Sequence, residues 1–140
     1  MEPLTVAIHT VIHSGRLYAG QNVVIFGAGP IGLLCMAVAR AQGAVRVIAV
    51  DVAPARLEFA KEYAATETFL PPAIEPGERK MDYSKRIAKE MKKTLGIEER
   101  GPDSIDLVVE ASGAETCIQT GILIAKFGGT FVQVSFGSLR

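Results

Sequence analysis

Short apolar runs alternate along this chain with stretches whose apolar residues recur at helical spacing. The apolar runs predict strands at residues 23–26, 45–50, 66–70, 105–110 and 130–136. Helical spacing predicts helices near residues 4–13, 33–41, 54–64 and 115–125. Strands that alternate with helices are typical of a parallel sheet covered on both faces. We therefore predict an α/β fold with a doubly wound parallel sheet of about five strands.

The polar segment 71–102 interrupts this alternation and is predicted to hold one further helix, capped by Asp82 and ended by Gly96. An i+4 apolar stripe would dock this helix on the sheet: Tyr83, Ile87, Met91 and Leu95. Its basic residues are Lys85, Arg86, Lys89, Lys92 and Lys93. They could form a patch for a polyanion, but the acidic residues 90, 98 and 99 favour a solvated face.

The most informative motif follows the first predicted strand, where glycines stand at positions 27, 29 and 32. Gly27 allows a tight turn, Gly29 leaves room for a pyrophosphate, and Gly32 lets the next helix pack closely on the strand. Pro30 fits the first helical turn because its missing N–H is not needed there. The amides of Ile31 and Gly32 would then face the anion. This arrangement predicts a dinucleotide site.

Asp51 ends the second predicted strand, at the spacing from the glycines that is typical of a carboxylate bound to the adenosine ribose. Two unit charges about 4 Å apart repel by about 4 kcal/mol at an effective dielectric constant near 20. A 2′-phosphate would therefore be disfavoured, and we predict NAD rather than NADP. Arg56 leaves two interpretations open, because it either flanks the ribose and offsets part of this repulsion or is a solvated helix residue.

Ligands of doubly wound sheets bind beyond the carboxyl ends of the strands where the connection reverses, here between the first and fourth strands. Ser112, in the segment after the fourth strand, falls at this point. The end of the fifth strand would line the nicotinamide: Val134, Ser135 and Phe136. Glu110 could act as a general base, but no His, Lys or Tyr is positioned to complete a proton relay. We interpret it as a strand-end carboxylate bonded to local backbone.

Composition narrows the class of protein. The 140 residues are 49% hydrophobic, enough for one packed domain, and 15 basic and 15 acidic residues give no reason to expect a nucleic-acid or anionic-membrane partner. No apolar run reaches the roughly 18 residues of a membrane span. The opening Met-Glu-Pro does not resemble a signal peptide, and Cys35 and Cys117 are expected to be reduced core thiols. We therefore expect a cytoplasmic protein.

Metal-binding patterns are weak in this sequence. There is no Cys-x-x-Cys pair, so no structural zinc site is expected. His9 and His13 are four residues apart and would share one helix face, but Thr10 stands where a His-Glu-x-x-His motif needs Glu. We interpret both histidines as satisfied or solvent-facing.

Together, several of these motifs resemble the coenzyme domain of zinc-dependent medium-chain dehydrogenases, in particular the sorbitol and xylitol dehydrogenases, also called D-xylulose reductases. The matching positions are residues 2–9, 27–32, 51 with 56, 110–115, 118–121 and 128–130, and residues 80–106 are similar to fungal members. The resemblance covers nearly the whole chain. It implies NAD-dependent oxidation of a sugar polyol to the ketose, with a zinc ion polarising the substrate oxygen.

The resemblance also implies roles for individual residues. Glu2 would lie at the catalytic zinc or bind its water, Ile31 would contact the pyrophosphate, and Asp51 with Arg56 would contact the ribose. Residues 1–22 would be a connecting helix from an absent catalytic domain, and 23–140 an NAD-binding domain without its sixth strand. Ser135 stands where a glycine is common, which would crowd the nicotinamide.

From this resemblance we expect a fragment that binds NAD but is inactive alone, with no bound zinc apart from a possible contact of Glu2. Members of the family are homo-oligomers, and a polyol would be the substrate of the full-length enzyme. Two other functions stay open at this point. The chain could be a stand-alone NAD(H)-binding or sensing module, or an interaction protein that uses the exposed edge of the strand at 130–136. FAD or S-adenosylmethionine in place of NAD is not excluded.

Overall fold

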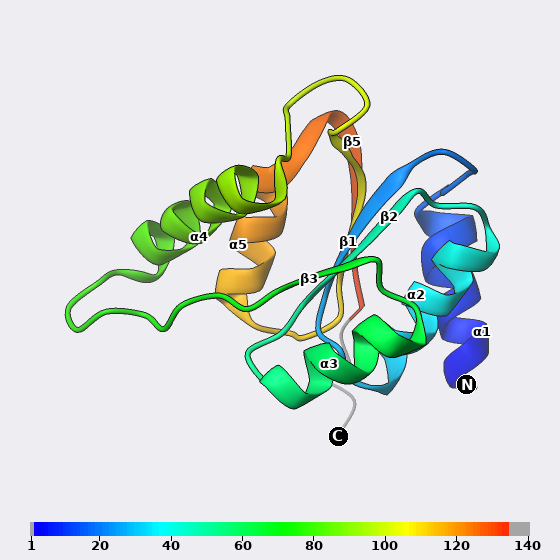
Figure 1. Ribbon diagram of the computed structural model, residues 1–140, viewed down its shortest axis with the longest axis horizontal. Helices are drawn as coiled ribbons and strands as arrows, with labels where there is room; N and C mark the ends of the chain where they lie inside the picture. The colour runs from blue at the N-terminus through cyan, green and yellow to red at the C-terminus, as the bar shows by residue number, and fades with distance from the viewer. Residues whose placement is uncertain (1, 135–140) are drawn as a thin grey trace.

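The computed structural model describes residues 2–134, which contain one five-stranded sheet in the order β3-β2-β1-β4-β5 (Figure 1). Its strands are β1 (Asn22–Phe26), β2 (Arg46–Val50), β3 (Glu67–Phe69), β4 (Ile105–Glu110) and β5 (Ala125–Gln133). All neighbouring strands are parallel. Strands β2 and β3 are added on one side of β1, and β4 and β5 are added on its other side, so the order of strands reverses between β1 and β4. The predicted doubly wound α/β fold is confirmed.

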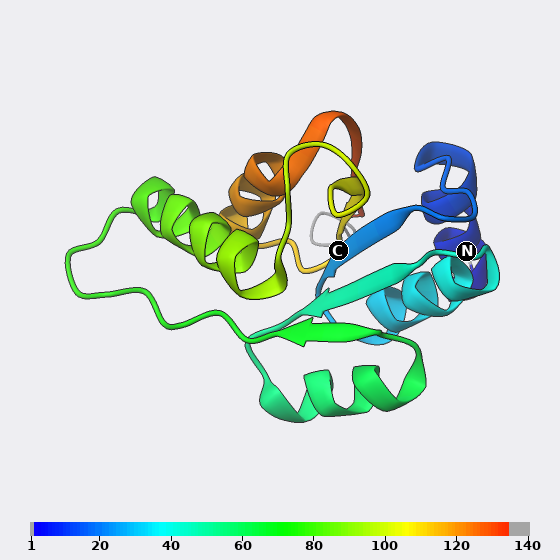
Figure 2. The ribbon, with the colours of Figure 1, turned by 45° about the horizontal axis from the view of Figure 1, so that its top comes forward.

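Helices cover both faces of this sheet (Figures 1 and 2). They are α1 (Pro3–Ile8), the π-helical η1 (His9–Ser14), α2 (Pro30–Ala41), α3 (Pro54–Tyr63), α4 (Lys80–Leu95) and α5 (Glu115–Ile124). The first four pack on one face, and α4 and α5 pack on the other. Within residues 2–134, no helix has both the length and the apolar character needed to cross a membrane.

The central strands bury both of their faces. Val23 and Ile25 of β1 belong to the apolar cluster under α1 and α2, whereas Val24 and Phe26 belong to the cluster under α4 and α5. Side chains alternate between the two sides of a strand, so a strand covered on both sides is apolar throughout. This explains why these strands were recognisable as continuous apolar runs.

The apolar stripe of α4 docks on the sheet as predicted. Ile87 and Met91 are buried in the cluster beneath α4, and Tyr83 and Leu95 pack against its border. Gly96 has a φ of +67° and ends the helix in the left-handed conformation that favours glycine, which confirms its predicted role.

The start of α4 was predicted wrongly. Its N-cap is Arg79 rather than Asp82, and the helix begins at Lys80. The amide of Tyr83 already donates to the Arg79 carbonyl at 2.9 Å, so helical bonding starts three residues earlier than expected. Asp82 lies in the first turn, where its carboxylate accepts a hydrogen bond from Arg79 Nε at 3.1 Å.

The N-terminal helix and β5 also depart from the predicted elements. The helix begins at Pro3, and its second half is π-helical, with the Gly15 amide bonded to Thr10 O, five residues back. Strand β5 begins at residue 125 rather than 130, because pairing with β4 starts directly after α5. A register irregularity follows, in which β5 has four residues, 126–129, where β4 has only residue 106, so the predicted glycine pair lies inside the strand.

Candidate functional site

The turn after β1 has the shape that the glycine motif predicts. Gly27 has a φ of +103°, a conformation that side chains other than glycine rarely adopt, and its amide donates to Val50 O at 2.8 Å. A Cβ atom on Gly32 would lie 1.8 Å from the Gly27 carbonyl oxygen. Helix α2 therefore begins directly against this turn, and only glycine at position 32 permits that approach.

The N-terminus of α2 faces open space. Gly29 is its N-cap and Pro30 its first residue, as predicted. A Cβ atom on Gly29 would meet no heavy atom within 4 Å, so the space above it could hold a ligand. The first-turn amides of Ile31 and Gly32 have no acceptor inside the helix, and the first turn carries no acidic side chain. This helix end can therefore bind an anion.

Asp51 lies beside this turn with both of its carboxylate oxygens fixed. Oδ2 accepts a hydrogen bond from the Ala28 amide at 2.8 Å, and Oδ1 accepts one from the Ala53 amide at 2.9 Å. The side chain is only 6% exposed. Each oxygen retains a second lone pair, so the carboxylate can still accept hydrogen bonds from ribose hydroxyls.

Arg56 approaches this carboxylate from α3. Its Nη1 lies 3.8 Å from Asp51 Oδ2, but its side chain is 63% exposed. An ion pair as exposed as this contributes little and is screened by salt. Arg56 can thus flank a bound ribose or extend into solvent, and both interpretations made from the sequence remain open.

The turn after β4 surrounds a second buried carboxylate. Glu110 accepts hydrogen bonds from the amides of Ser112 and Gly113 at 2.8 and 2.7 Å, and from the Ser112 hydroxyl. These contacts confirm the interpretation of Glu110 as a strand-end carboxylate bonded to local backbone. Ser112 itself is exposed.

A pocket of about 370 Å³ lies between these segments, within the range of about 300–1,000 Å³ that is usual for ligand sites. Its lining residues are Gly27, Gly29, Val50, Asp51, Val52, Arg56, Pro71, Ala111, Ser112, Ala114 and Cys117. The structure thus brings together five of the predicted residues, four from three different loops and Arg56 from α3. Pro30, Ile31 and Gly32 lie beside it at the start of α2. Val134 instead packs against the core cluster beneath α2, and Ser135 and Phe136 lie outside the described residues.

The sequence did not indicate the apolar part of the pocket lining, which is formed mainly by valine, alanine and proline. Such residues have no chemical signature, and only their places at strand ends could have indicated them. The sequence assigned Cys117 to the core; it packs against the cluster beneath α4 and α5 as expected, but it is only half-buried and also lines the pocket. Burial raises the pKa of the Cys117 thiol, a hydrogen bond with Ser112 lowers it, and the Glu110 and Asp51 charges raise it. Cys117 is therefore a protonated wall residue at neutral pH.

The candidate metal-binding residues lie at the N-terminus. Glu2 is exposed at the N-cap of α1, where its carbonyl accepts a hydrogen bond from the Val6 amide. The rings of His9 and His13 lie 5.7 Å apart and both residues are exposed, in agreement with solvent-facing histidines. In the part of the chain that the structure describes, no three His, Cys, Asp or Glu side chains form a group that could hold a metal ion.

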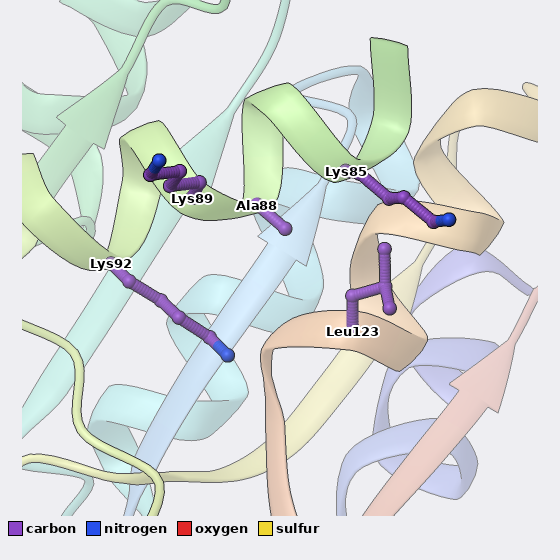
Figure 3. A pocket seen from close by; sticks show the side chains of 5 residues that line it. All are labelled: Lys85, Ala88, Lys89, Lys92 and Leu123. Carbon is purple, nitrogen blue, oxygen red and sulfur yellow. The ribbon is translucent and has the colours of Figure 1, made fainter. Parts of the chain in front are cut away.

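A second hollow of about 270 Å³ lies between α4 and α5, lined by Lys85, Ala88, Lys89, Lys92 and Leu123. Figure 3 shows lysine side chains of α4 on either side of Leu123 of α5. Lys92 Nζ lies 3.8 Å from a carboxylate oxygen of Glu99, as expected for a solvated face with mixed charge. None of the lining residues provides a buried polar group that would orient a ligand, so this hollow is a weaker candidate than the pocket beside Asp51.

Comparison with known proteins gives a consistent set of relatives. A model of the family described as zinc-binding dehydrogenase matches residues 30–139. Probable D-xylulose reductase A of Aspergillus fumigatus is 47% identical over 98% of the chain, and D-xylulose reductase A of Aspergillus oryzae is 48% identical over the same share. The chain spans 35% of the length of each of these curated relatives.

Two solved structures illustrate the similarity in fold. A putative zinc-binding dehydrogenase from Sinorhizobium meliloti, bound to NADP, is 33% identical with a TM-score of 0.73, and the match covers 94% of this chain and 34% of that one. Galactitol-1-phosphate dehydrogenase from Escherichia coli is 28% identical with a TM-score of 0.72, over 94% of this chain and 33% of that one.

Proposed function

Because the chain belongs to the zinc-binding dehydrogenase family, we propose that the pocket at the carboxyl ends of β1, β2 and β4 binds NAD. One observation carries this proposal: the open space above Gly29 and the fixed carboxylate of Asp51 border the same pocket. A phosphate-binding turn and a ribose-binding carboxylate are the two polar elements that a dinucleotide requires of such a fold.

The pocket and the adjoining start of α2 offer suitable groups for the adenine ring, the ribose and the pyrophosphate of the coenzyme. Val52, Pro71 and Ala114 provide apolar surface for the flat adenine ring, and Asp51 lies where its oxygens can bind the ribose hydroxyls. The pyrophosphate would lie above Gly29, at the amides of Ile31 and Gly32. Bound NAD supplies the hydride acceptor, while these residues hold and orient it.

NAD is favoured over NADP by the way Asp51 is held. Two backbone amides fix its carboxylate, so the side chain cannot rotate away from a 2′-phosphate. Repulsion between these like charges would then lower NADP affinity. The Sinorhizobium meliloti relative was solved with NADP, so coenzyme preference has to be measured for this chain and is not inherited from the fold.

The whole protein is proposed to interconvert a sugar polyol and its ketose, which the names of the D-xylulose reductases support. In this proposal residues outside these 140 hold the polyol and most of the coordination of the catalytic zinc, and Glu2 contacts the zinc or its bound water. The 140 residues alone would bind coenzyme without turnover. A cytoplasmic location, supported by the free thiols Cys35 and Cys117, and homo-oligomeric assembly remain part of the proposal.

Calorimetric titration of the chain with NAD and NADP tests this function. We expect micromolar to millimolar NAD binding, on the order of −4 to −8 kcal/mol, and at least about tenfold weaker NADP binding. In Asp51→Asn the ratio of the two affinities should approach one, because the repelling charge is lost. The matched control is Glu58→Gln, an exposed acidic residue of α3, which should keep the preference. A folded chain that binds neither nucleotide would contradict the proposal.

A further inference from the structure

Glu110, the last residue of β4, is fully buried, with no exposed surface. Glu110 takes part in none of the ion pairs that the structure shows between residues 2 and 134. Burying a carboxylate is costly unless hydrogen bonds satisfy both of its oxygens. We therefore ask which groups the buried Glu110 carboxylate holds in place.

Among the described residues, all hydrogen-bond partners of the Glu110 carboxylate lie in the turn that follows it. Oε2 accepts from the Ser112 amide at 2.8 Å and from the Ser112 hydroxyl at 2.5 Å, and the Gly113 amide donates to both Oε1 and Oε2, at 2.7 and 2.9 Å. Three donors converge on two oxygens, an arrangement that suits the ionised carboxylate, whereas an amide in the same place would bring its NH₂ group against the Gly113 amide. The side chain thus fixes the turn from inside.

The same turn packs against the glycine turn and forms a wall of the coenzyme pocket. The Ala111 amide donates to Phe26 O at 2.8 Å, and a Cβ atom on Gly27 would lie 3.0 Å from the Ala111 carbonyl carbon. Ala111 and Ser112 line the pocket together with Asp51. A shift of this turn by a few tenths of an ångström would therefore change the width of the pocket.

We propose that Glu110 is a positioning residue for coenzyme binding: its carboxylate holds the turn 111–113 as one wall of the pocket that receives the adenosine half of NAD. This inference rests on the proposed function, because it takes NAD as the occupant. Glu110 itself makes no contact with the coenzyme and acts through Ser112 and Gly113.

The test is Glu110→Gln, which keeps the size of the side chain but replaces an accepting oxygen with a donating NH₂ group. NAD and AMP share the adenosine half, so both should lose affinity by the same factor, about tenfold. The ratio of NAD to NADP affinity should not change, since Asp51 is intact. Titrations are made at a temperature at which circular dichroism shows the variant to be folded. The control is Glu115→Gln, whose side chain is 61% exposed and should leave both affinities unchanged.

A merely structural role of Glu110 would lower the melting temperature but would leave the affinities of the folded variant unchanged, and that result would overturn the inference. Loss of NAD affinity without loss of AMP affinity would also overturn it. If Glu110→Gln does not fold, Ser112→Ala decides, because it removes one donor of the same network: an equal loss of about threefold for NAD and AMP supports the inference, and no change overturns it. An unaltered chain that fails to bind NAD would instead overturn the proposed function.

Discussion

The carboxylate of Asp51 accepts a hydrogen bond of 2.8 Å from the amide of Ala28, which connects the end of β2 to the turn after β1. The residue proposed to select the coenzyme is therefore also part of the scaffold of the phosphate-binding turn. These two roles of Asp51 can be measured separately, because its support of the turn affects the stability of the chain even when no nucleotide is bound.

Asp51→Ala should destabilise the chain in the absence of nucleotide. The substitution leaves the amides of Ala28 and Ala53 without their side-chain acceptor, and the Ala28 amide lies in a buried environment. An unsatisfied buried donor costs about 1–3 kcal/mol of unfolding free energy. Urea denaturation followed by circular dichroism measures this difference. A loss below the error of the extrapolation would show that the turn does not depend on Asp51.

Substitution by alanine should affect the stability of the chain very differently at two glycines of the same motif. In Gly32→Ala the new methyl group would lie 1.8 Å from Gly27 O, so we expect a loss of about 3 kcal/mol in unfolding free energy. In Gly29→Ala the methyl group meets no atom within 4 Å and φ is −79°, so stability should change by less than about 0.5 kcal/mol.

NAD titration completes this comparison. The methyl group of Gly29→Ala would enter the space proposed for the pyrophosphate, so this stable variant should lose NAD affinity by about tenfold or more. Equal NAD affinity of Gly29→Ala and the unaltered chain would place the pyrophosphate elsewhere.

The sequence predicted the fold well where one physical requirement dominated. Central strands buried on both faces are continuous apolar runs, and the turn at Gly27 needs a residue that tolerates positive φ. Element ends were less predictable: Arg79 rather than Asp82 caps α4, because the first turn forms through backbone bonds and gains no side-chain cap.

The candidate site was predictable in its polar part alone. Gly29 and Asp51 have chemistry that indicates a phosphate and a ribose, but the half-buried position of Cys117 depends on how α5 packs over the sheet. The network at Glu110 likewise depends on the path of the turn that follows it, which the sequence indicates only as a strand-end carboxylate. These features arise from tertiary packing, which a local sequence pattern does not indicate.

Acid should weaken the ion pair between Arg46 and Glu67, which joins β2 to β3. Arg46 donates to both carboxylate oxygens of Glu67, at 2.8 and 2.5 Å, and also to Leu95 O. The hydrogen bond with Arg46 lowers the pKa of Glu67 below its usual value of 4.5, against the opposing effect of burial. A lowered folded-state pKa means that this stabilisation is present above about pH 4.5 and is lost as the pH falls through the folded-state value.

In Glu67→Gln, the dependence of unfolding free energy on pH should therefore be flatter below about pH 4.5. Because the Glu67 side chain is 32% exposed, we expect a difference of at most about 1 kcal/mol from the unaltered chain at pH 7. Denaturation series between pH 3 and 7 would measure both quantities. Glu115→Gln, at an exposed ion pair, serves as the control, and parallel acid profiles for all three chains would contradict the expectation.

The two free thiols should differ in reactivity, and NAD should protect only one of them. Cys35 is fully buried, and burial raises its pKa to about 12, so less than about one thiol in a thousand is ionised at pH 8. Cys117 is half-buried in the wall of the pocket, so a thiol reagent should reach it first, although burial raises its pKa as well. Mass spectrometry after timed alkylation would report the order.

Saturating NAD should slow the modification of Cys117 by about tenfold or more, because the adenosine half would cover the pocket and leave access only to the free fraction. Modification of Cys35 should not depend on NAD in the folded chain, since its rate follows opening of the core. Cys117→Ser identifies which signal belongs to which thiol. Equal protection of both thiols would indicate that NAD stabilises the whole fold without covering Cys117, and no protection at saturating NAD would place the coenzyme away from this wall.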